Sequence, residues 1–160
     1  MKKIVLTLIF LLVISFIVVL IVTRHNDERQ IHGYLISLAA MLSKSINGGG
    51  IVALAEIHRI GAFFTDDCRI VVGDSIPEIH GREALIATIY QIRKMVADEV
   101  EVAFHDVSIT IRKNKVTAIS IKTAVVTHAS AREIRDIEMH WEKTEERWKI
   151  AEAKAIPILY

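Results

Sequence analysis

Residues 132–156, REIRDIEMHWEKTEERWKIAEAKAI, decide the fold of the region that follows residue 24. Ile137, Met139 and Trp141 alternate with polar residues, and a period of two is typical of a half-buried β-strand. The polar tract TEE at 144–146 then turns the chain, and another strand-like run begins at Trp148. Because so short a connection joins antiparallel neighbours, the stretch predicts a long hairpin.

The period of two extends upstream of this hairpin, and a helical period precedes it. Two more strands are expected at 100–111 and 116–127, which completes an antiparallel meander. Apolar residues at spacings of three and four predict helices over 28–44, over 51–64 and from residue 82 to about residue 97. A short strand is expected at 69–72. Helices followed by a long-stranded sheet indicate the α+β class.

The N-terminal residues are a separate unit. Residues 4–23, IVLTLIFLLVISFIVVLIVT, carry no charge. A helix of that length spans roughly 30 Å, the thickness of a bilayer's hydrocarbon core. The alternative is a cleaved secretory signal, but such a signal has a shorter apolar run and small residues at its cleavage site, whereas this run ends in LIVTRH. We therefore expect a transmembrane anchor at 1–24, a short linker at 25–30 and one domain at 31–160.

The charges on the two flanks of this apolar run predict its orientation. Lys2, Lys3 and the chain amine precede the run, whereas Arg24 and Arg29 follow it. This excess of about one positive charge before the run favours a cytoplasmic N-terminus and an extracytoplasmic domain. The whole chain has 20 basic and 19 acidic residues, so it carries no basic field that would hold nucleic acid. The sequence contains no glycine-rich phosphate loop, CxxC or GxSxG motif, and no cofactor is expected.

Three segments of the chain resemble a known superfamily. They are FFTDDCRI at 63–70, EIHGREALI at 78–86, and HWEK at 140–143 followed by RWKIA at 147–151. In this order and spacing they are similar to the nuclear transport factor 2-like superfamily, particularly its SnoaL-like members, over about residues 28–156. The resemblance implies three helices packed in a strongly curved, mainly antiparallel sheet, the cystatin-like cone, with a pocket at its open end. Members include isomerases, dehydratases, cyclases and hydrolases as well as non-catalytic binders, so the fold alone leaves the function open.

The resemblance also allows a test for isomerase chemistry. Ketosteroid-isomerase-like members use a carboxylate base near the end of the first short strand, together with a tyrosine and a protonated acid. In this chain the base position falls on Val72 and the acid position on Met139, and neither side chain can move a proton. Tyr34 is the candidate for the tyrosine of this catalytic set. The sequence therefore favours a non-catalytic role.

Five residues are candidates for lining the pocket: His105, Glu152, Tyr34, Trp148 and His80. Strand periodicity places His105 on one face with the apolar residues at 107, 109 and 111, and places Glu152 on one face with Trp148. Each of these titratable residues also fits a solvated or structural position. Asp136, Glu138, His140 and Glu142 alternate along one strand face, which we interpret as solvated, and no metal site is expected.

Two functions remain open at this point. The first is a membrane-anchored small-ligand-binding or assembly module, dimeric through a flat sheet face formed by Ala151, Ala153 and Ala155, with the bilayer and a membrane protein as further partners. The second is a SnoaL-like enzyme of isomerase, dehydratase or hydrolase type that acts on a small hydrophobic substrate through His105 or Glu152.

Overall fold

The computed structural model describes residues 26–43, 51–73, 77–95, 100–112, 116–128, 131–145 and 147–156. These residues form three helices and six strands. The first helix covers residues 26–42. The other elements are α2 (Ile51–Gly61), β1 (Phe64–Val71), β2 (Ile79–His80), α3 (Arg82–Met95), β3 (Val100–Ile111), β4 (Thr117–His128), β5 (Ala131–Thr144) and β6 (Arg147–Ile156).

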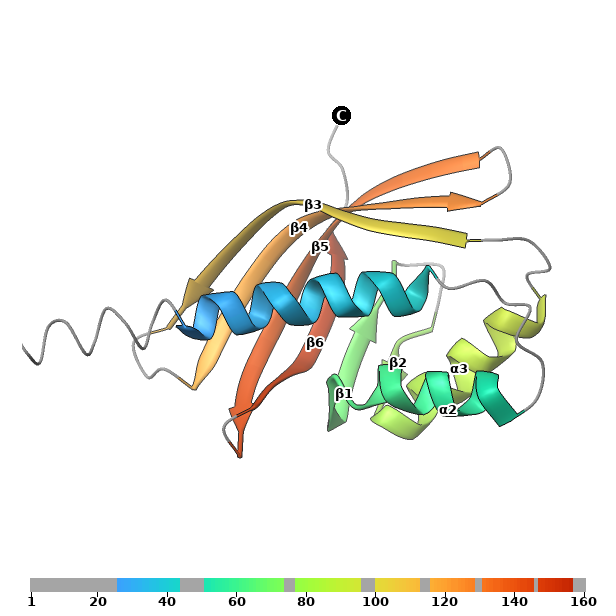
Figure 1. The fold of residues 1–160 in the computed structure, drawn as a ribbon, viewed down its shortest axis with the longest axis horizontal. Coiled ribbons are helices and arrows are strands. Elements are labelled where there is room, and N and C mark those ends of the chain that lie inside the picture. Colours follow the sequence, from blue (N-terminus) through green and yellow to red (C-terminus); the bar gives the residue numbers. More distant parts are fainter. Residues whose placement is uncertain are drawn as a thin grey trace, which may run out of the picture.

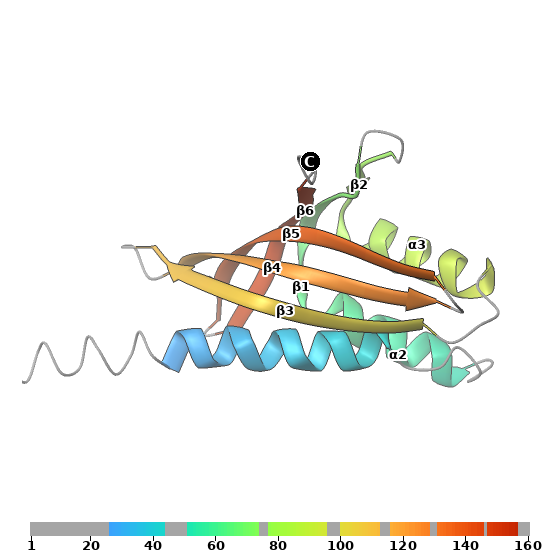
Figure 2. The same cartoon turned by 90° about the horizontal axis from the view of Figure 1, so that it is seen from above.

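The six strands form one curved sheet in the order β2-β1-β6-β5-β4-β3. The strands from β3 to β6 pair with their chain neighbours in antiparallel fashion, which confirms the predicted meander. The parallel pair of β1 and β6 makes the sheet mixed. Figure 1 shows the long strands bending over the first helix, and Figure 2 shows α2 and α3 gathered at the end of the sheet away from residue 26.

The core lies between the first helix and the sheet face that this helix covers, here called the inner face. Ile31, Leu35 and Leu38 of the helix are at most 2 % exposed and pack in one cluster with Trp141 and Trp148. The predicted helical stripe is therefore confirmed, and so is the strand face of Ile137, Met139 and Trp141. The alternate positions of β5 lie on the opposite, outer face, as expected for the stripe that begins at Asp136.

The start of β1 differs from the sequence prediction. The predicted second helix reached residue 64, but α2 ends at Gly61 and β1 begins at Phe64. Phe64 is 6 % exposed and pairs with Ile150 of β6, and the amide of Ile150 donates a hydrogen bond of 2.8 Å to the carbonyl of Phe63. The local apolar pattern at 63 and 64 predicts helix, because only the pairing with β6, distant in sequence, shows that a strand begins at Phe64.

The N-terminal predictions fall partly outside the described residues. The first helix begins at residue 26, within the predicted linker and two residues before the predicted helix start, because buried Asp27 anchors this turn to Lys143 and Trp148 through hydrogen bonds of 3.0 and 3.2 Å. Among the helices that the structure describes, none is both long enough and apolar enough to cross a bilayer. The predicted anchor at residues 4–23 lies outside the described residues.

Candidate functional site

The inner side of the cone is mostly apolar. Among the described residues, the buried polar side chains are Asp27, Thr65, Ser120 and Lys122. Ser120 accepts a hydrogen bond of 2.8 Å from Trp141 Nε1, and Asp27 accepts from Lys143 and from Trp148 Nε1. These bonds give each indole N–H the partner that a buried donor requires. Ser120 and Asp27 therefore have structural roles as acceptors for the two indoles, whereas Lys122 serves neither indole.

Lys122 is a buried amine on the inner face of β4. Its residue is 1 % exposed, its Nζ lies 2.6 Å from Met139 Sδ, and the same atom lies 4.9 Å from the centre of the Phe104 ring. None of the described carboxylates forms an ion pair with it. Burial lowers the pKa of Lys122 from 10.5 to about 7, because an ammonium is poorly solvated in apolar surroundings. A neutral amine of this kind can act as a base or a nucleophile near neutral pH.

His105 does not line the inner side, contrary to the sequence prediction. It pairs with Thr123, while Ser108 pairs with Ile121, so β3 has one residue more than β4 between these two pairs. The extra residue forms a β-bulge, and Asp106 within it has a φ of 51°. Because a bulge shifts the alternation by one, the apolar residues at 107, 109 and 111 face inward while His105 faces outward.

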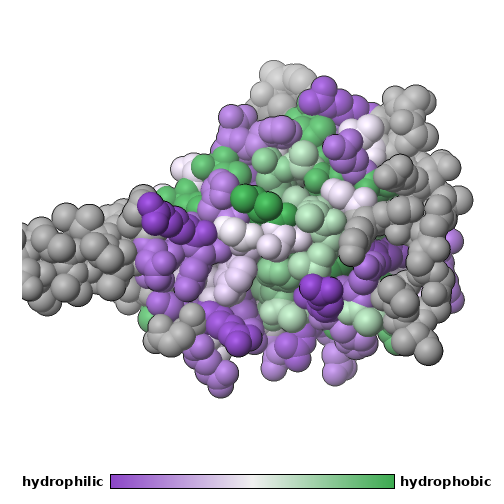
Figure 3. Space-filling view, viewed as in Figure 1, coloured by the Kyte–Doolittle hydropathy of each residue, from purple (hydrophilic) through white to green (hydrophobic). Residues whose placement is uncertain are grey.

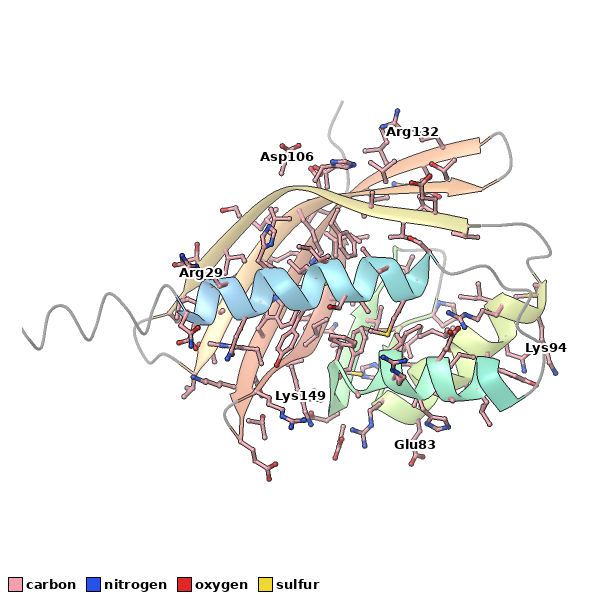
Figure 4. All side chains as sticks on the ribbon, in the orientation of Figure 1. Arg29, Glu83, Lys94, Asp106, Arg132 and Lys149 are labelled. Carbon is pink, nitrogen blue, oxygen red and sulfur yellow. The ribbon has the colours of Figure 1, made fainter. Side chains whose placement is uncertain are left out.

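His105 instead lines an outer pocket. A pocket of about 290 Å³ is formed by Glu101, Ala103, His105, Val125, Thr127 and Arg132. Figure 4 shows Arg132, and Asp106 of the bulge, on the side of the sheet away from the first helix. This pocket is separate from the enclosed side of the cone, so His105 cannot act on a ligand held there.

Glu152 also lies on the outer face, and a second bulge is the reason. Ile150 pairs with Trp141, whereas Glu152 pairs with His140, so β6 has one residue more than β5 between these pairs. The predicted shared face of Glu152 and Trp148 is therefore wrong. The same shift turns Ala153 inward, where it is 8 % exposed in the core, so the predicted outer face of three alanines is also wrong.

Glu152 and His80 belong to one surface network. Arg69 of β1 is bonded through Nε to Glu78 and through Nη1, at 3.2 Å, to Glu152. His80 Nε2 lies 3.1 Å from the second oxygen of Glu78. The hydrogen bond from Arg69 lowers the pKa of Glu78, and the same bond raises the pKa of Arg69. These contacts join β2, β1 and β6 across the sheet edge, which is a structural role.

Tyr34 and Trp148 are the two candidates that the structure does bring together. With Ala62, Phe63, Arg82, Arg147 and Lys149 they line a pocket of about 240 Å³, here called the Tyr34 pocket. Tyr34 lies edge to face against Phe63, with ring centres 5.8 Å apart. Lys149 is at the end of the sheet where β1 and β6 begin (Figure 4). The pocket combines aromatic walls with three cationic side chains.

Neither of the two positions tested for isomerase chemistry carries a titratable group. Val72 follows β1 and is 46 % exposed, and Met139 is 5 % exposed beside Lys122. In the described part of the chain, no group of three or more His, Cys, Asp or Glu side chains has the arrangement to hold a metal ion. Buried Cys68 is a poor nucleophile, because burial and then the charge of Asp67 raise the pKa of its thiol.

Sequence reasoning missed Lys122 and the cationic side of the Tyr34 pocket. A signal for Lys122 was present: it occupies one strand face with the small residues Ala118, Ser120 and Ala124, which leave room for a long side chain. Arg147 and Lys149 are ordinary surface residues in sequence. Only the packing of Tyr34 and the 62–63 turn against β6 shows that they share a pocket.

Helices packed against a strongly curved six-stranded sheet define the cystatin-like cone of nuclear transport factor 2-like proteins. Solved structures agree. The fold is similar to a nuclear transport factor 2-like protein with a cystatin-like fold from Novosphingobium aromaticivorans, with a TM-score of 0.70 and 14 % identity over 86 % of this chain and 85 % of that one. It is also similar to a candidate scytalone dehydratase from the same organism, with a TM-score of 0.65 and 14 % identity over 86 % and 87 % of the two chains.

A third similar structure is a candidate aromatic ring hydroxylase from Novosphingobium aromaticivorans, with a TM-score of 0.67 and 12 % identity over 84 % of this chain and 91 % of that one. At these identities the likeness shows the fold alone. The family follows from the sequence, because the SnoaL-like domain family matches residues 55–154. The chain therefore belongs to the SnoaL-like family. No curated protein matches it.

Proposed function

We propose that this chain is a membrane-tethered, non-catalytic module that binds a small ligand or a protein partner. The proposal rests on which polar side chains are buried on the inner side of the cone. Acid–base catalysis in a dry pocket requires a proton donor and acceptor placed together at the substrate. Of the four buried polar side chains in the described residues, Asp27 and Ser120 serve buried indole N–H groups, Thr65 is neither an acid nor a base, and Lys122 has no titratable partner.

The membrane tether in this proposal is the apolar run at residues 4–23. Since residue 26 is already helical, only a few residues separate that run from the folded domain. The full-length chain should stay in the membrane pellet after an alkaline carbonate wash and require detergent for release. A variant with Leu12→Arg is the matched control and should weaken retention. Full-length protein that washes free of membranes would contradict the tether.

The topology of the tether has its own test. The flanking charges favour a domain outside the cytoplasm, and we propose this orientation. Protease added to intact spheroplasts should then degrade the domain, whereas a cytoplasmic marker protein should survive. Protection of the domain until the membrane is broken would reverse the orientation.

Exposed apolar side chains support a partner surface. Ile121 and Ile134, on the outer face of β4 and β5, are 44 % and 43 % exposed, and we propose a homodimer through this face. The full-length chain in detergent should have the mass of a dimer. The double variant Ile121→Glu/Ile134→Glu should be monomeric, while Ile92→Glu, at an equally exposed site on α3, should not. A wild-type monomer would exclude this interface.

The first helix offers a second apolar surface. Ile36 is 60 % exposed on its outward side, and Figure 3 shows hydrophobic residues gathered across the middle of this side of the molecule, bordered by hydrophilic ones. A membrane protein partner is proposed here. Cross-linking from a photoreactive residue at position 36 in native membranes should capture a membrane protein, and capture of soluble proteins alone would argue against it.

Lys122 favours an alternative, a SnoaL-like enzyme on a small hydrophobic substrate. The likeness to candidate dehydratase and hydroxylase structures is compatible with it. A neutral lysine amine adds to an aldehyde with loss of water, and cyanoborohydride reduces the imine to a stable amine. At neutral pH, benzaldehyde with cyanoborohydride should label Lys122 faster than exposed Lys154. Slower labelling of Lys122 would remove this alternative, and the variant Lys122→Met identifies the modified peptide.

A further inference from the structure

We infer that the Tyr34 pocket binds a small aromatic acid, meaning a single ring that carries a carboxylate or phosphate group. The pocket lies between the first helix, the 62–63 turn, the start of α3 and the start of β6. The inference rests on the proposed function as a ligand-binding module and names the class of ligand.

The walls of the pocket are aromatic and well fixed. Tyr34 meets Phe63 at an interplanar angle of 80°, and the carbonyl of Phe63 is held by the amide of Ile150. Trp148 is 1 % exposed, and its indole N–H is bonded to Asp27 on the first helix. Tyr34 and Phe63 are partly exposed, so their fixed rings favour a flat ligand that can stack on them or meet them edge to face, while buried Trp148 supports them from below.

The charged side chains of the pocket are all cations. Arg82 is paired, at 2.8 Å, with Asp66, whose side chain is 80 % exposed to solvent. Glu142 lies opposite Lys149 in the register of β5 and β6, but no described carboxylate forms an ion pair with Arg147 or Lys149. The Tyr34 hydroxyl makes no hydrogen bond within the described structure and can donate one to a ligand. An acidic group would therefore find two uncompensated cations and a donor beside an apolar wall.

The size of the pocket limits the ligand. Its volume of about 240 Å³ lies below the range of roughly 300–1,000 Å³ that is typical of sites for drug-sized molecules. A single ring with one acidic substituent matches this volume, whereas a polycyclic substrate exceeds it. Among the lining residues Arg147 is exposed and Lys149 is partly exposed, whereas Trp148 is buried, so the ring can lie on the buried side and the acid on the solvent side.

The test is calorimetric titration of the full-length chain in nanodiscs of zwitterionic lipid. Benzoate and phenyl phosphate should bind, while benzyl alcohol, which lacks the charge, and inorganic phosphate, which lacks the ring, should bind at least about tenfold more weakly. The double variant Arg147→Gln/Lys149→Gln should lose about tenfold or more in affinity for benzoate. Lys154→Gln, which removes a cation from the far end of the same strand, should bind as the wild type does.

Four results would overturn the inference. Equal benzoate affinity in the double variant and the wild type would exclude the pocket, and equal binding of benzyl alcohol would exclude an acid. Loss of benzoate binding in nanodiscs that contain anionic lipid would show that a lipid headgroup is the occupant. If no aromatic acid binds while the chain still resists carbonate extraction, the inference fails and the tether stands. If benzoate binds to protein that washes free of membranes, the tether fails and the inference stands.

Discussion

Lys122 Nζ on β4 lies 2.6 Å from Met139 Sδ on β5, on the inner face of the sheet. A thioether sulfur is a weak acceptor and carries no charge, so it offers an ammonium little compensation for lost hydration. The pair therefore explains why burial lowers the pKa of Lys122 to about 7. It also makes the stability of this domain dependent on pH.

Lys122→Met should stabilise the folded chain, and more so in acid. The pKa of Lys122 is about 7 when folded and 10.5 in the reference state, so between these values the unfolded chain binds more protons and the stability of the wild type rises with pH. The free-energy penalty for burying the charged Lys122 is complete below pH 7 and vanishes above about pH 10.5. The gain in unfolding free energy should be about 2–3 kcal/mol larger at pH 6 than at pH 9.

Denaturant unfolding of both proteins at the two pH values measures this gain. Lys154→Met, at an exposed position, is the control and should change stability equally at both. A gain for Lys122→Met that is the same at pH 6 and pH 9 would show that the buried amine does not titrate as inferred.

Ser120→Ala should destabilise the core by about 1–3 kcal/mol, because it leaves a buried indole N–H without an acceptor. Ser120 and Trp141 are 0 % and 1 % exposed, and their hydrogen bond is 2.8 Å. Ser108→Ala on the outer face of β3 is the matched control and should change the melting temperature little. Equal melting temperatures of the two variants would show that water or another group serves the indole.

Asp27→Ala should cost about 2–4 kcal/mol of unfolding free energy, because it removes the buried acceptor that Trp148 Nε1 and Lys143 share. Asp27→Asn keeps an oxygen at this position and should cost less. Chemical denaturation monitored by tryptophan fluorescence distinguishes the two. If both variants unfold like the wild type, the first turn of the helix does not contribute to the stability of the domain.

Asp106→Val should destabilise the β3 bulge by about 1–3 kcal/mol, because a β-branched side chain fits poorly at a positive φ. Asp106 has a φ of 51°, a value that glycine adopts without strain, so Asp106→Gly should be neutral or slightly stabilising. Thr110→Val, at an exposed position of the same strand, is the control for side-chain branching. A higher melting temperature for Asp106→Val than for Asp106→Gly would mean that the bulge is absent in solution.

The alternation of apolar and polar residues after residue 100 was enough to predict the meander, and spacings of three and four were enough to predict the helices. These patterns are local, because each strand or helix must turn its apolar side chains toward one core whatever its neighbours are. The three quoted motifs likewise led to the SnoaL-like family, which the match over residues 55–154 shows. The inward face of Trp141 and the stripe of Leu35 and Leu38 follow from sequence alone.

The positions of His105 and Glu152 were decided only by the tertiary structure. Each lies beside a bulge of one extra residue. Such a residue shifts the alternation, so side chains beyond the bulge face the side of the sheet opposite to the one that a regular strand would give them. Whether a strand carries such an insertion depends on the length and register of the partner strand, which no local pattern records. The burial of Lys122, the strand at Phe64 and the assembly of the Tyr34 pocket have the same origin, because each requires side chains far apart in the sequence to meet.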